Sequence, residues 1–202
     1  MPFNNLAMIW DLETTGLEGA GNMILCGVFK PYNEDPIVIR YDAFKAEGPK
    51  KKERSMVTAI IHLITDYPIW VGHNIARYDW GMLKTRAYKL GVKCPQVSAI
   101  VYDTMLAWRR SGFLSTLTRK GYPSASMENV IDLLGLPNQK TAIRKDHWME
   151  AVYGETAEIR TAVMNEIVDH CTRDVIMNEQ IFEKEIDPLE GMDVRANFKR
   201  VL

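Results

Sequence analysis

The first half of the chain alternates short apolar runs with turn-forming residues, which is the pattern of strands joined by tight connections. An apolar run at 6–10, "LAMIW", is followed by "DLETTGL", so we expect a buried strand that ends in a turn. The segments 23–30 and 36–44 are rich in β-branched and aromatic residues and flank "PYNEDP", which predicts a hairpin. Short buried strands are also expected at 68–74 and 98–105.

Other segments carry apolar residues at helical spacing. Helices are expected at 53–67, at 77–91 with a glycine stop, at 126–136 and over the long amphipathic stretch 156–185. This order predicts an α/β fold with a mixed central sheet, built from the hairpin plus parallel strands, and helices on both faces. No domain boundary is visible, so residues 1–202 are expected to form a single domain.

Composition is that of an ordinary globular protein, with 47% hydrophobic and 25% charged residues. There is no apolar run long enough for a membrane span, no secretion signal, and no cysteine spacing typical of disulfide frameworks or metal sites. We therefore expect a cytoplasmic protein that does not enter membranes. The net charge of −1 argues against coating nucleic acid by bulk charge, but it allows local contacts with a few phosphates.

Two acids, Asp11 and Glu13, follow directly on the apolar run 6–10. Because side chains alternate along a strand, residues i and i+2 point to the same face. Adjacent buried carboxylates repel each other, and a bound divalent cation such as Mg²⁺ is the natural compensation. The alternative is that the strand ends at Trp10 and the acids cap a turn, and this motif alone does not separate the two.

A third acid, Asp79, lies just inside an expected helix, and a fourth, Asp174, lies on the late helix with His170 one turn before it. An acid at a helix start and a His–Asp pair at i and i+4 both have ordinary structural explanations. Taken together, the four acids can instead converge on two Mg²⁺ or Mn²⁺ ions, the arrangement for in-line displacement at phosphorus. An imidazole that titrates near neutrality suits the base beside them.

Three segments in order, "WDLETTGL", "GHNIARYD" and "HCTRDV", resemble the three motifs of the DEDD-type 3′–5′ exonucleases of the RNase H-like superfamily. This group includes polymerase proofreading domains and RNA-trimming nucleases. The motif positions are Asp11 and Glu13 in the first, Asn74, Tyr78 and Asp79 in the second, and Asp174 in the third. The resemblance spans about residues 6–185, and the three motifs in this order are much more specific than any one of them.

The resemblance implies an RNase H-like fold and a metal-dependent exonuclease that releases nucleoside 5′-monophosphates from the 3′ end of a single strand. It implies that the four acids hold two Mg²⁺ or Mn²⁺ ions. Single-stranded DNA is favoured over RNA because the second motif is most similar to polymerase proofreading domains, and a polymerase or replication protein is the expected partner in trans. Two alternatives stay open: an exonuclease for RNA or oligoribonucleotides, and a non-catalytic nucleic-acid-binding module with the same fold.

The third motif departs from the family at its histidine. One group has Tyr four residues before the final Asp and another has His five residues before it, whereas His170 stands four residues before Asp174. Four residues advance a helix by about 400°, so the two side chains still share a face. His170 is therefore expected to act as the base or to orient water, with His147 and His73 as rival candidates.

The resemblance also assigns substrate contacts. Thr14, Thr15 and Leu17 match the part of the first motif that contacts the terminal nucleotide, with Leu17 wedged against its base, and a simple turn is the alternative. Asn74 either binds the substrate backbone or braces the second motif. The segment "AIRKDHW" contains Arg144, Lys145 and Trp148, which can serve the incoming strand by charge and stacking, but ordinary amphipathic helix surface is the favoured interpretation.

Overall fold

The computed structural model of the protein describes residue 3 and residues 5–94, 98–110, 118–119, 122–144, 146–186 and 198–200. Six strands form one sheet in the order β3-β2-β1-β4-β5-β8. They are β1 (Ala7–Thr14), β2 (Ile24–Pro31), β3 (Ile37–Arg40), β4 (Ile69–Gly72), β5 (Ile100–Asp103) and β8 (Phe198–Arg200). The β1–β2, β2–β3 and β5–β8 pairs are antiparallel, and the β1–β4 and β4–β5 pairs are parallel. The predicted hairpin and mixed sheet are therefore confirmed, and β1 lies inside the sheet.

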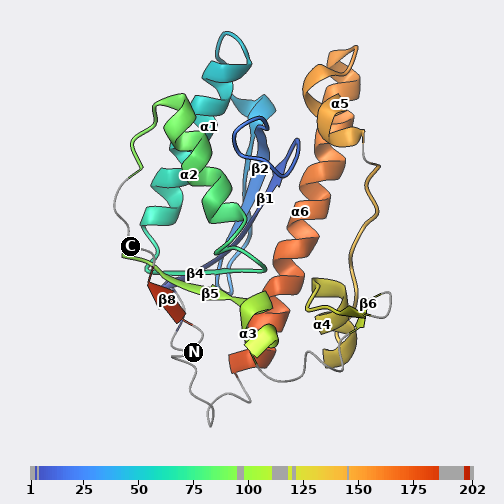
Figure 1. Ribbon diagram of the computed structural model, residues 1–202. Coiled ribbons are helices and arrows are strands. Elements are labelled where there is room, and N and C mark those ends of the chain that lie inside the picture. The colour runs from blue at the N-terminus through green and yellow to red at the C-terminus, as the bar shows by residue number, and fades with distance from the viewer. Residues whose placement is uncertain are drawn as a thin grey trace.

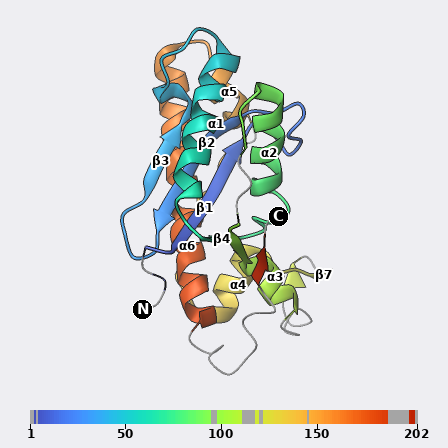
Figure 2. The ribbon, with the colours of Figure 1, turned by 90° about the vertical axis from the view of Figure 1, so that its left-hand side faces the viewer.

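Helices cover both faces of the sheet, as predicted. α1 (Pro49–Thr65) and α2 (Asp79–Leu90) lie on one face and the long α6 (Ala157–Ile186) lies on the other (Figures 1 and 2). The shorter elements are η1 (Tyr41–Ala43), α3 (Thr104–Arg110), α4 (Met127–Leu134), α5 (His147–Tyr153) and a separate strand pair, β6 (Thr118–Arg119) with β7 (Tyr122–Pro123). Among the described helices, none is long and apolar enough to cross a membrane.

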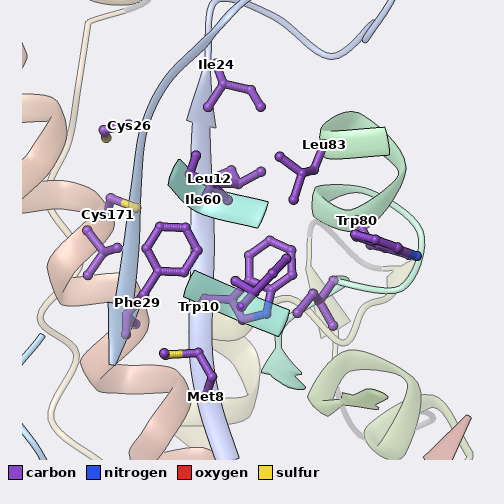
Figure 3. Packing of buried hydrophobic residues seen from close by; sticks show 14 of the residues in the cluster. Met8, Trp10, Leu12, Ile24, Cys26, Phe29, Ile60, Trp80, Leu83 and Cys171 are labelled. Atoms are coloured by element: carbon purple, nitrogen blue, oxygen red, sulfur yellow. The ribbon is translucent and has the colours of Figure 1, made fainter. Parts of the chain in front are cut away.

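β1 presents different chemistry to the two faces of the sheet. Trp10 packs on Phe29 of β2 with ring centroids 5.9 Å apart, and Figure 3 shows Trp10 in the apolar layer between β1 and the helices α1 and α2. Asp11 and Glu13 alternate with these apolar residues and receive contacts from α6. Because β1 continues to Thr14, the alternative in which the strand ends at Trp10 is wrong.

The elements differ from the sequence expectations at several places, among them the strand expected at 98–105, which ends at Asp103 where α3 begins. α1 begins at Pro49 rather than at residue 53, because Gly48 adopts a left-handed φ of 79° and proline is tolerated in the first turn of a helix, where its missing N–H is not needed. β8 was not expected, because a three-residue edge strand carries no periodicity and depends on its backbone pairing with β5. None of these differences moves the strands that carry the candidate site.

A buried ion pair ties the two helices on one face to the first hairpin. Glu53 of α1 is 1% exposed, and its carboxylate accepts hydrogen bonds from Arg86 Nε at 2.7 Å and Arg86 Nη2 at 2.6 Å. The same carboxylate accepts the N–H of Ile24 at 3.1 Å, and Arg86 Nη1 donates to the carbonyl of Gly19 at 3.2 Å. The pair therefore holds the loop that follows β1 against α1 and α2.

Glu53→Gln is expected to lower the free energy of unfolding by about 3 kcal/mol, because it leaves the buried Arg86 guanidinium without its counter-charge. Urea denaturation measures this loss. The matched control is Lys51→Ala on the same helix, which removes an exposed ion pair with Glu47 before the helix and should cost less than about 1 kcal/mol. Equal losses in the two variants would contradict the role given to the buried pair.

Candidate active site

Asp11 and Glu13 of β1 lie together with Cys171 of α6. Ligand atoms of these three residues all lie within 4.8 Å of one another, a spacing that can hold a metal ion. Cys171 Sγ is 3.5 Å from Asp11 Oδ2. Nothing in the sequence gives Cys171 a role, because it stands far from the other cysteines. Only the packing of α6 on β1 brings it to this position. Carboxylates rather than a thiol suit Mg²⁺ or Mn²⁺, so the two acids are the stronger candidates for ligands.

Asp79 is the first residue of α2 and is buried behind this pair. Its Oδ1 accepts the backbone N–H of Leu12, the residue between Asp11 and Glu13, at 3.1 Å. This hydrogen bond fixes the start of α2 against β1. Asp79 therefore lies beside the two acids of the first motif, although it does not line the cavity in front of them.

Asp174 and His170 come from one face of α6, as their spacing predicted. His170 Nε2 lies 3.9 Å from Glu13 Oε1 and 3.9 Å from Asp174 Oδ2. Asp174 Oδ2 is 3.6 Å from Lys140 Nζ, while its Oδ1 is buried and finds no hydrogen-bond partner among the described residues. A buried carboxylate oxygen without a donor needs either a hydrogen-bond donor or a cation at this position.

The electrostatics of the four acids also indicate a shortage of positive charge. Burial, followed by repulsion from Asp79, Glu13 and Asp174, raises the pKa of Asp11 well above its ordinary value. Burial raises the pKa of Glu13 to about 7 and that of Asp79 to about 8. Burial also raises the pKa of Asp174, although Lys140 and His170 lower it. A divalent cation fits this site, because it would neutralise carboxylates that otherwise favour their protonated forms.

The two rival candidates, His147 and His73, make their contacts away from the acids. His147 Nδ1 lies 3.0 Å from Glu166 Oε2, and its Nε2 accepts a hydrogen bond from Arg144 Nε at 2.7 Å. His73 Nδ1 lies 3.0 Å from Thr104 Oγ1, and burial lowers the pKa of His73 to about 4. Of the three candidate histidines, only His170 has a described contact with the acids, which favours it as the base over His147 and His73.

Three residues before and within α5 contact the site; the sequence assigned no role to Lys140 or Thr141, and it offered a stacking role for Trp148 only as the less favoured alternative. Lys140 lies beside Asp174, Thr141 Oγ1 is 2.9 Å from His170 Nδ1, and Trp148 Nε1–H donates to Glu13 Oε2 at 2.9 Å. The expectation that Trp148 is ordinary helix surface is therefore wrong. The segment between α4 and α5 has no periodicity that marks these positions, because its path is set by packing against α6.

A cavity of about 630 Å³ opens in front of the acids. Its lining consists of Asp11, Leu12, Glu13, Thr14, Thr15, Gly16, Leu17, Tyr78, Trp148 and Asp174. Leu17 is 82% exposed and free to meet a ligand, whereas the Thr14 hydroxyl lies 2.7 Å from the Tyr78 hydroxyl and Thr15 Oγ1 accepts the N–H of Met23. The two threonines therefore shape the turn, and Leu17 is the most accessible of the three side chains.

Asn74 does not line this cavity. It adopts a left-handed φ of 68°, and its backbone N–H donates to Asp103 Oδ1 at 3.1 Å, while the N–H of Ala76 donates to Asp103 Oδ2. Asn tolerates this backbone conformation better than most residues. The geometry favours the interpretation in which Asn74 braces the second motif.

Comparison with known proteins places this fold in a family. The model of the RNase_H superfamily matches residues 8–185. The chain belongs to the RNase_H superfamily. Nucleases of this superfamily are hydrolases that use divalent metals, in agreement with the acidic cluster. Among curated proteins, no relative matches this chain.

One solved structure with a similar fold is the family B DNA polymerase from the hyperthermophilic archaeon Pyrobaculum calidifontis. The TM-score is 0.60 at 16% sequence identity, and the match covers 89% of this chain. It covers 24% of the polymerase chain, so this protein spans about a quarter of that length. At this identity the similarity shows a shared fold, and it agrees with the predicted RNase H-like architecture.

Proposed function

We propose that the protein is a DEDD-type 3′–5′ exonuclease that hydrolyses single-stranded DNA to nucleoside 5′-monophosphates. The observation that carries this proposal is that acids from β1 and α6 line one cavity beside the imidazole of His170, with Asp79 of α2 buried behind them. Asp11, Glu13, Asp79 and Asp174 would hold two Mg²⁺ or Mn²⁺ ions. Such ions, when bound, activate water and neutralise the charge that develops on the phosphate and the leaving oxygen.

His170 is the group that would take the proton of the attacking water. Its Nε2 faces Glu13 and Asp174, and its Nδ1 is held by the Thr141 hydroxyl, so the ring has a fixed orientation. A base held in one orientation does not have to rotate before each proton transfer. Lys140 adds positive charge beside Asp174 and is itself held by Glu128 at 3.3 Å.

The cavity accommodates the 3′-terminal nucleotide of a splayed single strand. Exposed Leu17 offers an apolar contact for its base, and the acids lie where its phosphate must come. DNA is favoured over RNA by the resemblance of the second motif to proofreading domains and by the shared fold with a DNA polymerase. The same argument makes a polymerase the favoured partner in trans.

Thr141→Val is expected to lower kcat about ten-fold with little change in KM, because valine keeps the shape but releases His170 Nδ1. Steady-state rates on a labelled single strand measure the effect. Thr58→Val is the matched control, because the Thr58 hydroxyl bonds only to its own helix, at the carbonyl of Arg54, and no rate change is expected. An unaltered kcat in Thr141→Val would contradict the orienting role of this hydroxyl.

The polarity and the sugar preference are tested together with 5′-labelled DNA and RNA strands of one sequence in the presence of Mg²⁺. The proposal predicts a ladder that shortens from the 3′ end, faster on DNA than on RNA and blocked by a 3′-phosphate. Faster degradation of RNA would move the assignment to an RNA exonuclease. Release of the labelled 5′ nucleotide first, or cleavage of a circular strand, would contradict 3′–5′ exonuclease action, and binding without degradation would indicate a non-catalytic module.

A further inference from the structure

Trp148 lies between two parts of the candidate active site. Its indole N–H donates to Glu13 Oε2 at 2.9 Å, and its side chain lines the cavity in front of the acids. Tryptophan has a single donor, so this hydrogen bond uses the edge of the indole, and the half-buried ring packs in part against the hydrophobic core and in part lines the cavity. A neutral donor also holds one oxygen of Glu13 without cancelling its negative charge.

The position of Trp148 is fixed by the residue before it. His147 Nδ1 lies 3.0 Å from Glu166 Oε2 on α6, and His147 Nε2 accepts a hydrogen bond from Arg144. The contact with Glu166 joins the start of α5 to α6, which also carries His170 and Asp174, while Arg144 lies in the segment before α5. Trp148 therefore lies in the first turn of a helix that begins beside α6.

The cavity combines apolar and acidic lining. Its large apolar or aromatic side chains are Leu12, Tyr78, Trp148 and Leu17, of which Leu17 is 82% exposed, and its acids are Asp11, Glu13 and Asp174. A ligand that suits both parts carries a flat aromatic group joined to an anion that reaches bound cations. The 3′-terminal nucleotide has both groups. The cavity volume of about 630 Å³ lies within the range of about 300–1,000 Å³ that is usual for small-ligand sites.

We propose that Trp148 has two roles in the reaction: its N–H orients Glu13, and its ring, together with Leu17, receives the base of the 3′-terminal nucleotide. This inference rests on the proposed function and adds a requirement for a base at the 3′ terminus. Stacking on an aromatic side chain tolerates every base because each has a π-face. The pocket therefore distinguishes a nucleotide with a base from an abasic one rather than one base from another.

Two substitutions separate the two roles. Trp148→Phe keeps an aromatic ring but removes the N–H, so kcat should fall about ten-fold on every strand while the preference for a base over an abasic 3′ terminus persists. Trp148→Ala removes both the ring and the N–H. The wild type is expected to prefer a base over an abasic terminus by about 10-fold to 100-fold in kcat/KM, and in Trp148→Ala this preference should disappear and KM should rise. Tyr153→Ala, which removes a 62% exposed aromatic residue from the same helix, is the control and should behave as the wild type.

The kinetic test uses 5′-labelled single strands that end in deoxyadenosine or in an abasic residue. Loss of the base preference in Trp148→Ala, with its retention in Trp148→Phe, supports the stacking role. A full base preference in Trp148→Ala would overturn the stacking role, and a wild-type kcat in Trp148→Phe would overturn the orienting role. Both outcomes can be obtained only while the wild type degrades the strand, so they are distinct from a failure of the proposed function.

Binding tests the stacking role without catalysis. Deoxyadenosine 5′-monophosphate should quench the tryptophan fluorescence of the wild type more than deoxyribose 5-phosphate does. The difference should vanish in Trp148→Phe, because the quenched indole is then absent. Equal quenching in the wild type and Trp148→Phe would overturn the proposal, even for a protein that cleaves no strand.

Discussion

Asp11→Asn is expected to lower the rate of strand shortening by at least about a thousand-fold while leaving the protein folded. Asparagine keeps the size of the side chain and an oxygen for the Cys171 contact, but it removes the charge that an ion needs. Metal-ion catalysis contributes several kcal/mol, and each 1.36 kcal/mol is about a ten-fold change in rate. Initial rates on a 5′-labelled single strand with saturating Mg²⁺ measure the loss.

The control for this loss is another aspartate on an element that carries the site. Asp169 of α6 pairs with Arg173 at 2.8 Å on the exposed side of the helix, so Asp169→Asn should leave the rate unchanged. Retention of more than about a tenth of the wild-type rate in Asp11→Asn would show that this acid is not an essential ligand.

Mg²⁺ or Mn²⁺ is expected to raise the melting temperature of the wild type by about 5–10 °C near pH 8. An ion at a hundred times its Kd contributes about 2.7 kcal/mol, and a chain of this size gains about 2–4 °C for each kcal/mol. The reason is that Asp11, Glu13, Asp79 and Asp174 are buried together and repel one another without a cation. Differential scanning calorimetry with and without the ion measures the shift.

The pH dependence follows from the direction of the pKa shifts. The pKa of Glu13 rises from 4.5 to about 7 and that of Asp79 from 3.8 to about 8, so the folded protein keeps protons that the unfolded chain loses. The contribution of these groups to the stability of the metal-free protein is therefore present below about pH 4 and is lost as the pH rises to about 8. Metal ions compete with protons for the same oxygens, so the stabilisation by metal should grow over this range.

Asp11→Asn should change how the melting temperature depends on metal. Without metal, near pH 8, it should melt at or above the temperature of the wild type, because one of the repelling charges is gone. Its response to Mg²⁺ should be small. A wild-type response in this variant, or no response in the wild type, would contradict the assignment of Asp11 as a ligand.

The fold and the acids could be predicted from the sequence because both depend on local patterns. Alternation along β1 placed Asp11 and Glu13 on one face of the strand, and the spacing of four residues placed His170 and Asp174 on one face of α6. Packing of α6 on the sheet then brings the two faces together. The end of α2 could also be predicted from its glycine, because Gly91 has a left-handed φ of 65°, a conformation that favours glycine.

The contacts around the acids could not be predicted in the same way. Lys140 and Thr141 lie in a segment without periodicity, and Trp148 lies on a seven-residue helix, so nothing local indicates which way they point. Their contacts with Asp174 and His170 and with Glu13 depend on how this segment packs against α6. Such long-range contacts are a property of the tertiary structure.

One measurement tests most directly whether carboxylates from β1, α2 and α6 form a single divalent-metal centre. Mn²⁺ is titrated into the wild type and Asp11→Asn near pH 8, and the free ion is followed by its electron paramagnetic resonance signal. We predict saturable binding of up to two ions by the wild type and loss of that binding in Asp11→Asn. Equal binding by the two proteins, or no binding by the wild type, would contradict the assignment of this site as a metal centre.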